Sequence, residues 1–364
     1  MTGQSVLIAG GYGVVGRRVA AHLARDYRVL VAGRHQAQAN SVAATIGHHA
    51  VGRELDITNN RLIAAALDGV TAVVSCIDQP QRLLLHAAIE RGLAYTDITP
   101  HLVELGRAEA YDDLFIAAKR AGSRVVLGTG IVPGISNVLV RALANSLEGA
   151  EKIVTSLLLS AGDTSGPASL DYFAKELTMP FEVHTDGQDV AAHAFTDPTL
   201  TEFPPPFGHR WAYLFPFSDQ VLYPRTMGAK TVVTRLSLEP PRLGRLLAVV
   251  LRIGAARLLA VDRVRRTLVA HRGKKAGRDE PQFALRVDVA HRTQSASGTL
   301  LGGAQADAAA IGASSTIRAL MEGEITSSGV WMPEQVIDPT RFFSRLAEHS
   351  LHVQLSAAVS RDRD

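Results

Sequence analysis

A glycine-rich stretch near the start of the chain has the spacing of a phosphate-binding loop. Gly11, Gly13 and Gly16 follow an apolar run and open an amphipathic helical pattern. In such a loop the first glycine permits a tight turn, the second lets the backbone approach a pyrophosphate, and the third allows close helix-to-strand contact. The helix N-terminus would add unpaired N–H groups and partial positive charge. The predicted dinucleotide loop is Gly11-Tyr12-Gly13-Val14-Val15-Gly16, and a glycine-rich turn without a ligand is the alternative.

The residues after the second predicted strand indicate which dinucleotide the loop would take. Gly33, Arg34 and His35 stand there, and no acid is present to accept from both ribose hydroxyls. Arg34 could hold a 2′-phosphate through a charge-assisted fork, so NADP(H) is preferred. NAD(H) is the alternative if Arg34 is only solvated. Asp56, after the third predicted strand, is expected to meet the adenine edge or to cap the next helix.

The carboxyl ends of the later strands should meet in the same crevice. Ser75, Cys76 and Ile77 are expected beside the nicotinamide ribose, where small side chains leave room for the ligand. Cys76 has no basic neighbour in the sequence and is interpreted as a small apolar group rather than a nucleophile. Asp97 is the first candidate for an acid or for the partner of a substrate cation; the alternative is a strand-end residue bonded to loop amides. The helix opening at Pro133-Gly134 would offer N–H groups to a carboxylate or carboxamide.

A second group of candidate residues lies in an aromatic and proline-rich stretch, residues 215–226. We interpret it as a rigid loop that forms a substrate wall. Arg225 could clamp a carboxylate, Tyr223 could donate a proton, and Asp219 could orient either one. The alternative is a structural ion pair in a packed turn. The histidines lack metal-ligand spacing, so no metal is predicted.

Alternating apolar runs and helical patterns predict an N-terminal Rossmann domain, a doubly wound parallel sheet of strand order 3-2-1-4-5-6. The expected strands are 5–10, 28–33, 51–55, 71–76, 93–97 and 124–127, and the expected helices are 14–25, 61–67, 81–91 and 104–121. The fold class is therefore α/β.

The pattern changes after residue 130, which indicates a second α/β (α+β) domain with a mixed or antiparallel sheet. Strands are expected at 152–159, 230–238 and 283–291 around a loop-rich middle, and helices at 133–144, 304–321 and 339–349. The predicted domains are 1–130 for NADP, 131–325 for substrate and dimerisation, and 326–364 as a C-terminal segment that packs back on the first domain and ends in a frayed tail.

Composition limits the function classes. The chain has 364 residues with 46% hydrophobic content, and 38 basic against 35 acidic residues leave a net charge of +3. This slim excess does not favour a nucleic-acid partner. A single cysteine fits a reducing cytoplasm. Arginines interrupt the apolar stretch 243–261, so residues 243–266 are expected to form a basic amphipathic helix that packs on the core or on a second subunit of a homodimer. Membrane-surface contact is the minor alternative.

Several motifs together resemble the saccharopine dehydrogenase-like oxidoreductases, in the branch of saccharopine reductase and its bacterial relatives. The matching stretches are residues 10–16, Val74-Ser75-Cys76-Ile77, Tyr95-Thr96-Asp97-Ile98, residues 130–137 and residues 329–339. The resemblance implies a Rossmann domain joined to an α/β domain and an NAD(P)-dependent enzyme that usually handles a C–N bond. It does not choose a substrate, because relatives act on saccharopine, lysine-derived imines and polyamine precursors.

Three functional hypotheses follow for a small-molecule substrate. The first is hydride transfer to an imine, or from a secondary amine, in an amino-acid-derived compound. The second is reduction of a C=C or C=O bond in a lipid or polyketide-like intermediate. The third is a dinucleotide-binding sensor or interaction module without catalysis. A pocket lined by charged groups would favour the first hypothesis, whereas an apolar tunnel would favour the second.

Overall fold

The computed structural model describes residues 3–98, 108–160, 173, 176–177, 179–253 and 283–360. The second half of the predicted helix at 243–266, the start of the one at 104–121 and the tail at 361–364 lie outside these residues. The chain divides into two compact units. The first combines Met1–Val138 with Ala306–His349, and the second combines Leu139–Gln305 with Ser350–Asp364.

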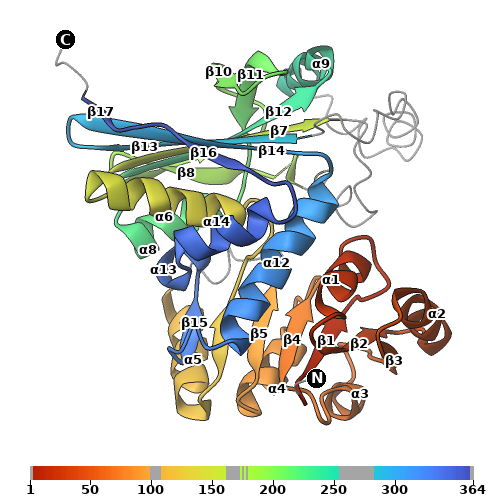
Figure 1. Ribbon diagram of the computed structural model, residues 1–364. Helices are drawn as coiled ribbons and strands as arrows, with labels where there is room; N and C mark the ends of the chain where they lie inside the picture. The colour runs from red at the N-terminus through yellow and green to blue at the C-terminus, as the bar shows by residue number, and fades with distance from the viewer. Residues whose placement is uncertain are drawn as a thin grey trace. The chain divides into compact units, whose positions relative to one another are not determined.

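A seven-stranded parallel sheet forms the first unit, with the order β15-β6-β5-β4-β1-β2-β3 (Figure 1). Its core strands carry side chains that are buried on both faces, such as Val6, Leu7 and Ile8, because helices cover a parallel sheet from both sides. The predicted order 3-2-1-4-5-6 is confirmed, and β15 extends it by one strand beside β6. The strands are β1 (Ser5–Ala9), β2 (Arg28–Gly33), β3 (Val51–Glu54), β4 (Ala72–Ser75), β5 (Ala94–Asp97), β6 (Arg124–Val126) and β15 (Gly329–Trp331).

The helix α2 was not predicted from the sequence. Its buried face consists of Ala39 and Ala43, so the apolar pattern is too weak to stand out from its polar neighbours. It fits tightly on β3, because a Cβ at Gly52 would lie 2.2 Å from the side-chain oxygen of Asn40. The other helices match predicted ones. The helices of this part are α1 (Gly16–Leu23), α2 (Gln36–Ile46), α3 (Asn60–Ala66), α4 (Leu83–Glu90), α5 (Ala108–Ala121) and α6 (Ile135–Leu147), which crosses into the second unit.

The C-terminal part of the first unit corrects the expected boundary at residue 325. Helix α12 (Gln305–Met321) is grouped with the Rossmann strands rather than with the second unit. Arg124 on β6 donates to the carbonyl of Leu320 at 2.7 Å, and Arg318 donates to that of His22 at 2.8 Å. Such contacts join residues distant in sequence, which local patterns do not reveal. Helices α13 (Pro333–Val336) and α14 (Pro339–Ala347) belong to the same unit.

A ten-stranded mixed sheet forms the second unit, with the order β10-β11-β12-β7-β13-β14-β16 along its main path. The predicted mixed sheet is confirmed: β12 and β7 run parallel, whereas β13 is antiparallel to β7 and to β14. Figure 1 shows α6 and α8 on one side of this sheet. The strands are β7 (Lys152–Ser160), β8 (Phe181–Thr185), β9 (Gln188–Ala192), β10 (Thr199–Phe203), β11 (Gly208–Leu214), β12 (Thr231–Glu239), β13 (Phe283–His291), β14 (Gln294–Gly302), β16 (Val353–Leu355) and β17 (Val359–Ser360).

Two expectations for the second unit were wrong. The loop-rich middle contains the hairpins β8-β9 and β10-β11. Strands β9 and β10 have mostly exposed side chains and so lack an apolar signature. The rigid loop expected at residues 215–226 is largely helix α8 (Asp219–Met227), which tolerates Pro224 in its interior. Leu222 and Tyr223 bury one face of this helix, so tertiary packing outweighs the proline.

Helix α9 (Pro241–Arg252) covers the first half of the predicted basic helix. It begins with Pro241 at its first position, where the missing N–H costs nothing. None of the helices in the described ranges combines the length and the apolarity that crossing a bilayer would require.

Candidate functional site

The glycine-rich turn after β1 is held by main-chain contacts that leave no space for a Cβ at Gly11 or Gly16. The left-handed conformation falls on Gly10, with φ +74°, and not on Gly11, where the sequence placed the tight turn. At Gly11 a Cβ would lie 2.8 Å from the carbonyl oxygen of Ile8, and at Gly16 it would lie 2.2 Å from that of Gly10. The last contact is far below van der Waals distance, so α1 approaches the end of β1 as closely as it does only because Gly16 has no side chain.

The start of α1 fits a phosphate ligand. No side chain caps this helix and no acid occupies its first turn, so its N-terminal charge is not neutralised by the chain. Gly13 is exposed, and a Cβ there would meet only the carbonyl oxygen of Gly10, at 3.1 Å. Val14 and Val15 lie between these glycines and are partly buried. Bare backbone at a helix start is the cradle that a pyrophosphate requires.

The end of β2 brings together the residues that the sequence predicts beside an adenosine ribose. Tyr12 lies over Gly33, where a Cβ would come within 2.3 Å of the tyrosine ring. Arg34 follows and is exposed, as a 2′-phosphate ligand should be. Asp56 accepts hydrogen bonds from the N–H and the hydroxyl of Thr58, at 2.9 and 2.7 Å, which lower its pKa. Asp56 therefore forms a turn ahead of α3, while the capping residue of that helix is Asn59.

The end of β4 lies against the glycine-rich turn. The side chain of Ile77 occupies the space beside Gly10, where a Cβ would lie 2.5 Å from its Cγ2. Ser75 is fully buried, and its hydroxyl donates to the carbonyl oxygen of Ile77 at 3.2 Å. Burial, together with the charge of Asp97, raises the pKa of the Cys76 thiol to about 12. This thiol stays protonated at neutral pH and is not an activated nucleophile.

Gln79 belongs to the candidate site through its hydrogen bonds, although the sequence does not single it out. Its amide nitrogen donates to the Ser75 hydroxyl at 2.8 Å and to the Tyr95 hydroxyl at 2.7 Å, and so ties the ends of β4 and β5 together. Its amide oxygen is buried and has no hydrogen-bond partner among the described residues. Glutamine after a strand is too common to signal this role, and the partner Tyr95 is distant in sequence.

Asp97 closes the same network at the end of β5 and is only 6% exposed. Its carboxylate accepts the N–H of Gly128 at 2.9 Å, and its carbonyl accepts the N–H and the hydroxyl of Thr129, at 2.7 and 2.8 Å. The hydroxyls of Thr96 and Thr129 are 2.8 Å apart. These bonds fix the carboxylate at the carboxyl edge of the sheet, beside Cys76.

The start of α6 does not offer the N–H groups that the sequence predicted. Gly134 donates to the side-chain oxygen of Asn137 at 2.7 Å, and Ile135 donates to the carbonyl of Gly130 at 3.0 Å. The amide nitrogen of Asn137 donates in turn to the buried Glu334 at 2.7 Å. The first turn of α6 is thus satisfied by the chain itself and is not available to a carboxylate.

The second predicted group lies on α8 in the second unit. Asp219 and Tyr223 are fully buried, whereas Arg225 is exposed. One oxygen of Asp219 accepts the hydroxyl of Thr234 at 2.7 Å, and the other has no hydrogen-bond partner among the described residues. Burial raises the pKa of Asp219 to about 6. Asp219 and Tyr223 are four residues apart and share the buried face of the helix, whereas Arg225 is exposed on another face and does not converge with them.

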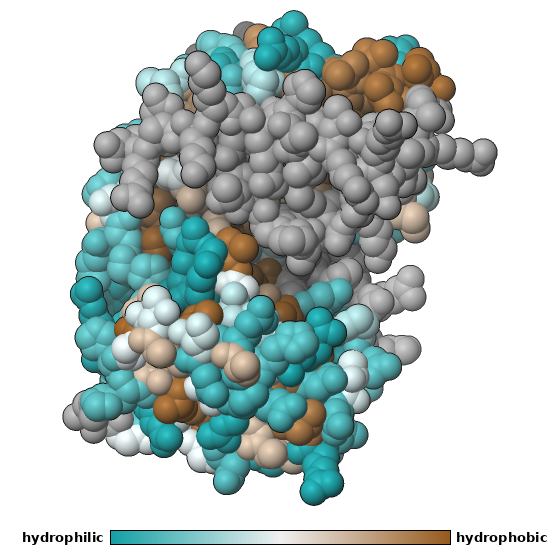
Figure 2. Space-filling view, turned by 90° about the vertical axis from the view of Figure 1, so that its right-hand side faces the viewer, coloured by the Kyte–Doolittle hydropathy of each residue, from teal (hydrophilic) through white to brown (hydrophobic). Residues whose placement is uncertain are grey.

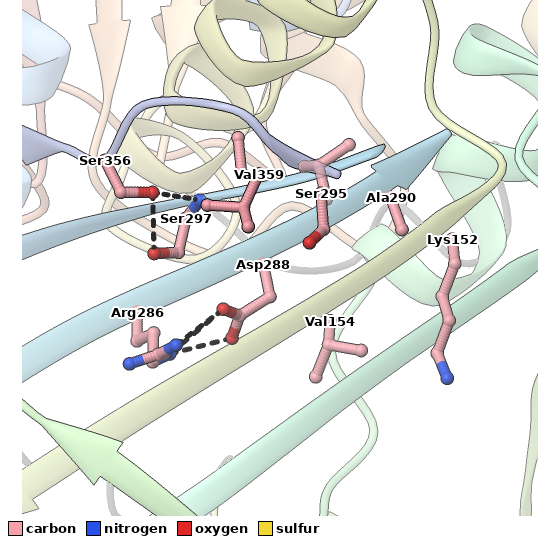
Figure 3. Close-up of a pocket in the computed structure, with 11 residues that line it drawn as sticks. Lys152, Val154, Arg286, Asp288, Ala290, Ser295, Ser297, Ser356 and Val359 are labelled. Atoms are coloured by element: carbon pink, nitrogen blue, oxygen red, sulfur yellow. Dashed lines mark hydrogen bonds and ion pairs between the residues drawn. The ribbon is translucent and has the colours of Figure 1, made fainter. Parts of the chain in front are cut away.

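A cavity of about 250 Å³ lies on the face of the second sheet formed by β7, β13 and β14 (Figure 3). Its charged side chains are Lys152, Arg286 and Asp288. Arg286 binds Asp288 through two nitrogens at 2.8 Å, and Ser297 lies 3.1 Å from Ser356. Most polar groups of this cavity therefore pair with one another, and we assign no ligand to it.

The comparison with protein families identifies the glycine-rich turn and its sheet. Residues 6–126 match the family model described as the saccharopine dehydrogenase NADP-binding domain. The first unit contains a saccharopine dehydrogenase NADP-binding domain. The predicted NADP cofactor is thus confirmed for this domain, and the predicted resemblance to the saccharopine dehydrogenase-like, NAD(P)-dependent oxidoreductases is confirmed over residues 6–126. Within this NADP-binding domain lie the loop 11–16, Arg34, the β4 end and Asp97.

One solved structure extends the likeness of fold beyond the NADP-binding domain. Apo histidine-tagged saccharopine dehydrogenase (L-Glu forming) from Saccharomyces cerevisiae has a TM-score of 0.70 and 14% identity, covering 98% of this chain and all of that one. The 3-ketoacyl-(acyl-carrier-protein) reductase from Brucella melitensis covers 34% of this chain and 73% of its own, with a TM-score of 0.28 and 19% identity. No curated protein sequence matches the chain.

Proposed function

We propose that the protein uses NADP(H) to reduce an imine, or to oxidise the corresponding secondary amine, at a C–N bond of an amino-acid-derived compound. One observation carries the proposal: the buried Asp97 carboxylate stands at the carboxyl edge of the sheet, next to the β4 end that flanks the cofactor loop. A fixed negative charge at this edge stabilises a cation, and an iminium, whose C=N carbon accepts the hydride to give the amine, is such a cation.

The chain's own residues prepare this chemistry. When bound, NADPH supplies the hydride. The start of α1 and Arg34 hold the charged end of the dinucleotide, and Gln79 fixes the β4 end through Ser75. The protonated thiol of Cys76 adds no competing charge, which leaves Asp97 as the negative group of this network. Its role is to stabilise positive charge on the substrate nitrogen.

Replacing Arg34 by aspartate should reverse the cofactor preference. The substitution removes the guanidinium that pairs with the 2′-phosphate and adds a carboxylate that accepts from the ribose hydroxyls of NADH. We expect NADPH affinity to fall by about 100-fold, about 2.7 kcal/mol, with NADH affinity unchanged or higher. Fluorescence titration with both nucleotides measures this, and Arg61→Asp, at an exposed arginine beyond β3, is the control. A preference for NADPH that survives Arg34→Asp would remove Arg34 from the site.

Replacing Asp97 by asparagine should lower kcat about 100-fold on an imine substrate, because the neutral amide no longer stabilises the cation. NADPH affinity should not change, since the fold of the loop is independent of this charge. The measurement is NADPH oxidation with a panel of cyclic imines and of oxo acids mixed with amino acids. Asp68→Asn, at an exposed position, is the control.

The same panel tests the proposal as a whole. Turnover of imines by the wild type supports the C–N assignment. Turnover of enones or ketones with no turnover of imines would overturn it in favour of C=C or C=O reduction. Wild-type kcat in Asp97→Asn would show that Asp97 only bonds loop amides.

A further inference from the structure

Helix α9 of the second unit presents apolar side chains on two opposite sides. On the inner side Gly244 and Leu247 are buried. Gly244 packs on the ring of Tyr213 on β11: a Cβ added at Gly244 would lie 3.4 Å from the Cε2 atom of that ring. This contact explains how the helix is attached to the sheet. It does not explain why the outer side of the helix holds further large apolar residues that are exposed to water.

The outer side carries Leu246 at 57% exposure, Val249 at 57% and Ile253 at 71%. Their spacing of three and four residues places them in one row along the helix. Figure 2 shows hydrophobic residues gathered at the top of the view, where Figure 1 places α9. Water-exposed rows of this kind are costly unless another surface covers them.

The charged side chains on α9 itself all have the same sign. Arg242, Arg245 and Arg252 are exposed on α9, and residues 241–253 contain no acid. A second copy of the chain, docked by a two-fold axis on this row, would bring these arginines against their own counterparts. An anionic surface that also accepts apolar side chains satisfies both features at once.

We propose that α9 is a docking site for an anionic lipid surface. The helix lies in the plane of the interface, Leu246, Val249 and Ile253 enter the acyl boundary, and the arginines contact lipid phosphates. The helix is too short to span a bilayer, so the contact is peripheral. This inference is independent of the reaction catalysed by the first unit.

Vesicle co-sedimentation of the full chain tests the proposal. We expect binding to phosphatidylglycerol vesicles, weak binding to phosphatidylcholine vesicles, and loss of binding at high salt. Neutralising Arg242, Arg245 and Arg252 to glutamine should weaken binding about 100-fold, since each basic residue near an anionic surface contributes about 1 kcal/mol. The variant Leu246→Ser/Val249→Ser should weaken it by at least about 10-fold, because both apolar side chains leave the acyl boundary.

Matched variants keep the test specific. Arg61→Gln/Arg120→Gln/Arg292→Gln removes the same charge from exposed positions elsewhere, and Val190→Ser removes an apolar side chain of 52% exposure from β9. Both should bind like the wild type, and NADPH affinity should be equal in all variants, which reports a folded first unit. Equal losses in these controls, or no binding of the wild type to phosphatidylglycerol, would overturn the proposal. A concentration-dependent dimer that Leu246→Ser/Val249→Ser dissociates would assign the row to a second copy instead.

Discussion

Replacement of Gly16 by alanine is expected to abolish measurable NADPH binding, with a loss of affinity of at least about 100-fold, about 2.7 kcal/mol. A Cβ at this position would lie 2.2 Å from the carbonyl oxygen of Gly10, 2.8 Å from its carbonyl carbon and 2.9 Å from the Cα of Gly11. All three are main-chain atoms, so no side-chain rotation relieves the clash. Helix α1 must move away from the turn, and its N-terminal N–H groups move with it.

Titration of NADPH fluorescence measures the loss, and thermal unfolding reports whether the variant folds. Gly69→Ala is a control in the same unit, because Gly69 has φ +68° and open space around its Cβ position. It should cost about 1 kcal/mol of stability through backbone strain and leave NADPH affinity unchanged. A Gly16→Ala protein that binds NADPH like the wild type would show that the loop does not hold the phosphates.

The second unit should lose stability as the pH rises, because of Asp219. Its folded pKa is about 6, above the reference value of 3.8, since burial disfavours the charged carboxylate. The neutral form is therefore favoured in the folded state, and its contribution is complete below pH 3.8 and lost as the pH rises through about 6. A shift of this size corresponds to about 3 kcal/mol.

The variant Asp219→Asn keeps the size of the side chain and cannot ionise. We expect the stability of this variant relative to the wild type, measured as the free energy of unfolding, to increase by about 3 kcal/mol between about pH 4 and pH 8. Chemical denaturation at several pH values measures the difference. Glu182→Gln, an exposed residue on β8, is the matched control and should show no such trend. A constant difference between Asp219→Asn and the wild type across this range would mean that Asp219 ionises like an exposed acid.

The cofactor half of the site could be predicted from the sequence because its signals are local. The glycine spacing at residues 11–16, the missing acid near Arg34 and the strand order all depend on neighbours within one βαβ unit. Strands such as β1 and β13 were also visible, since burial on both faces gives a continuous apolar run and burial on one face gives alternation. The family assignment rests on the same local motifs.

The rest of the site depends on contacts between residues far apart in the chain. Gln79 is a site residue through Tyr95, and the start of α6 is closed to ligands through Asn137 and the remote Glu334. The residues of 215–226 read as a loop, but packing of Leu222 and Tyr223 makes them helical. No local pattern encodes these outcomes.

The amino-acid sequence by itself determined the Rossmann domain, its NADP cofactor and the residues at the ends of its strands, because turn glycines and apolar periodicity act over a few neighbouring residues. Only the tertiary structure decided which polar groups are already paired, which acid is buried and which apolar row of α9 faces water. Burial and hydrogen bonding depend on what the folded chain brings near each side chain, and that is a property of the whole fold.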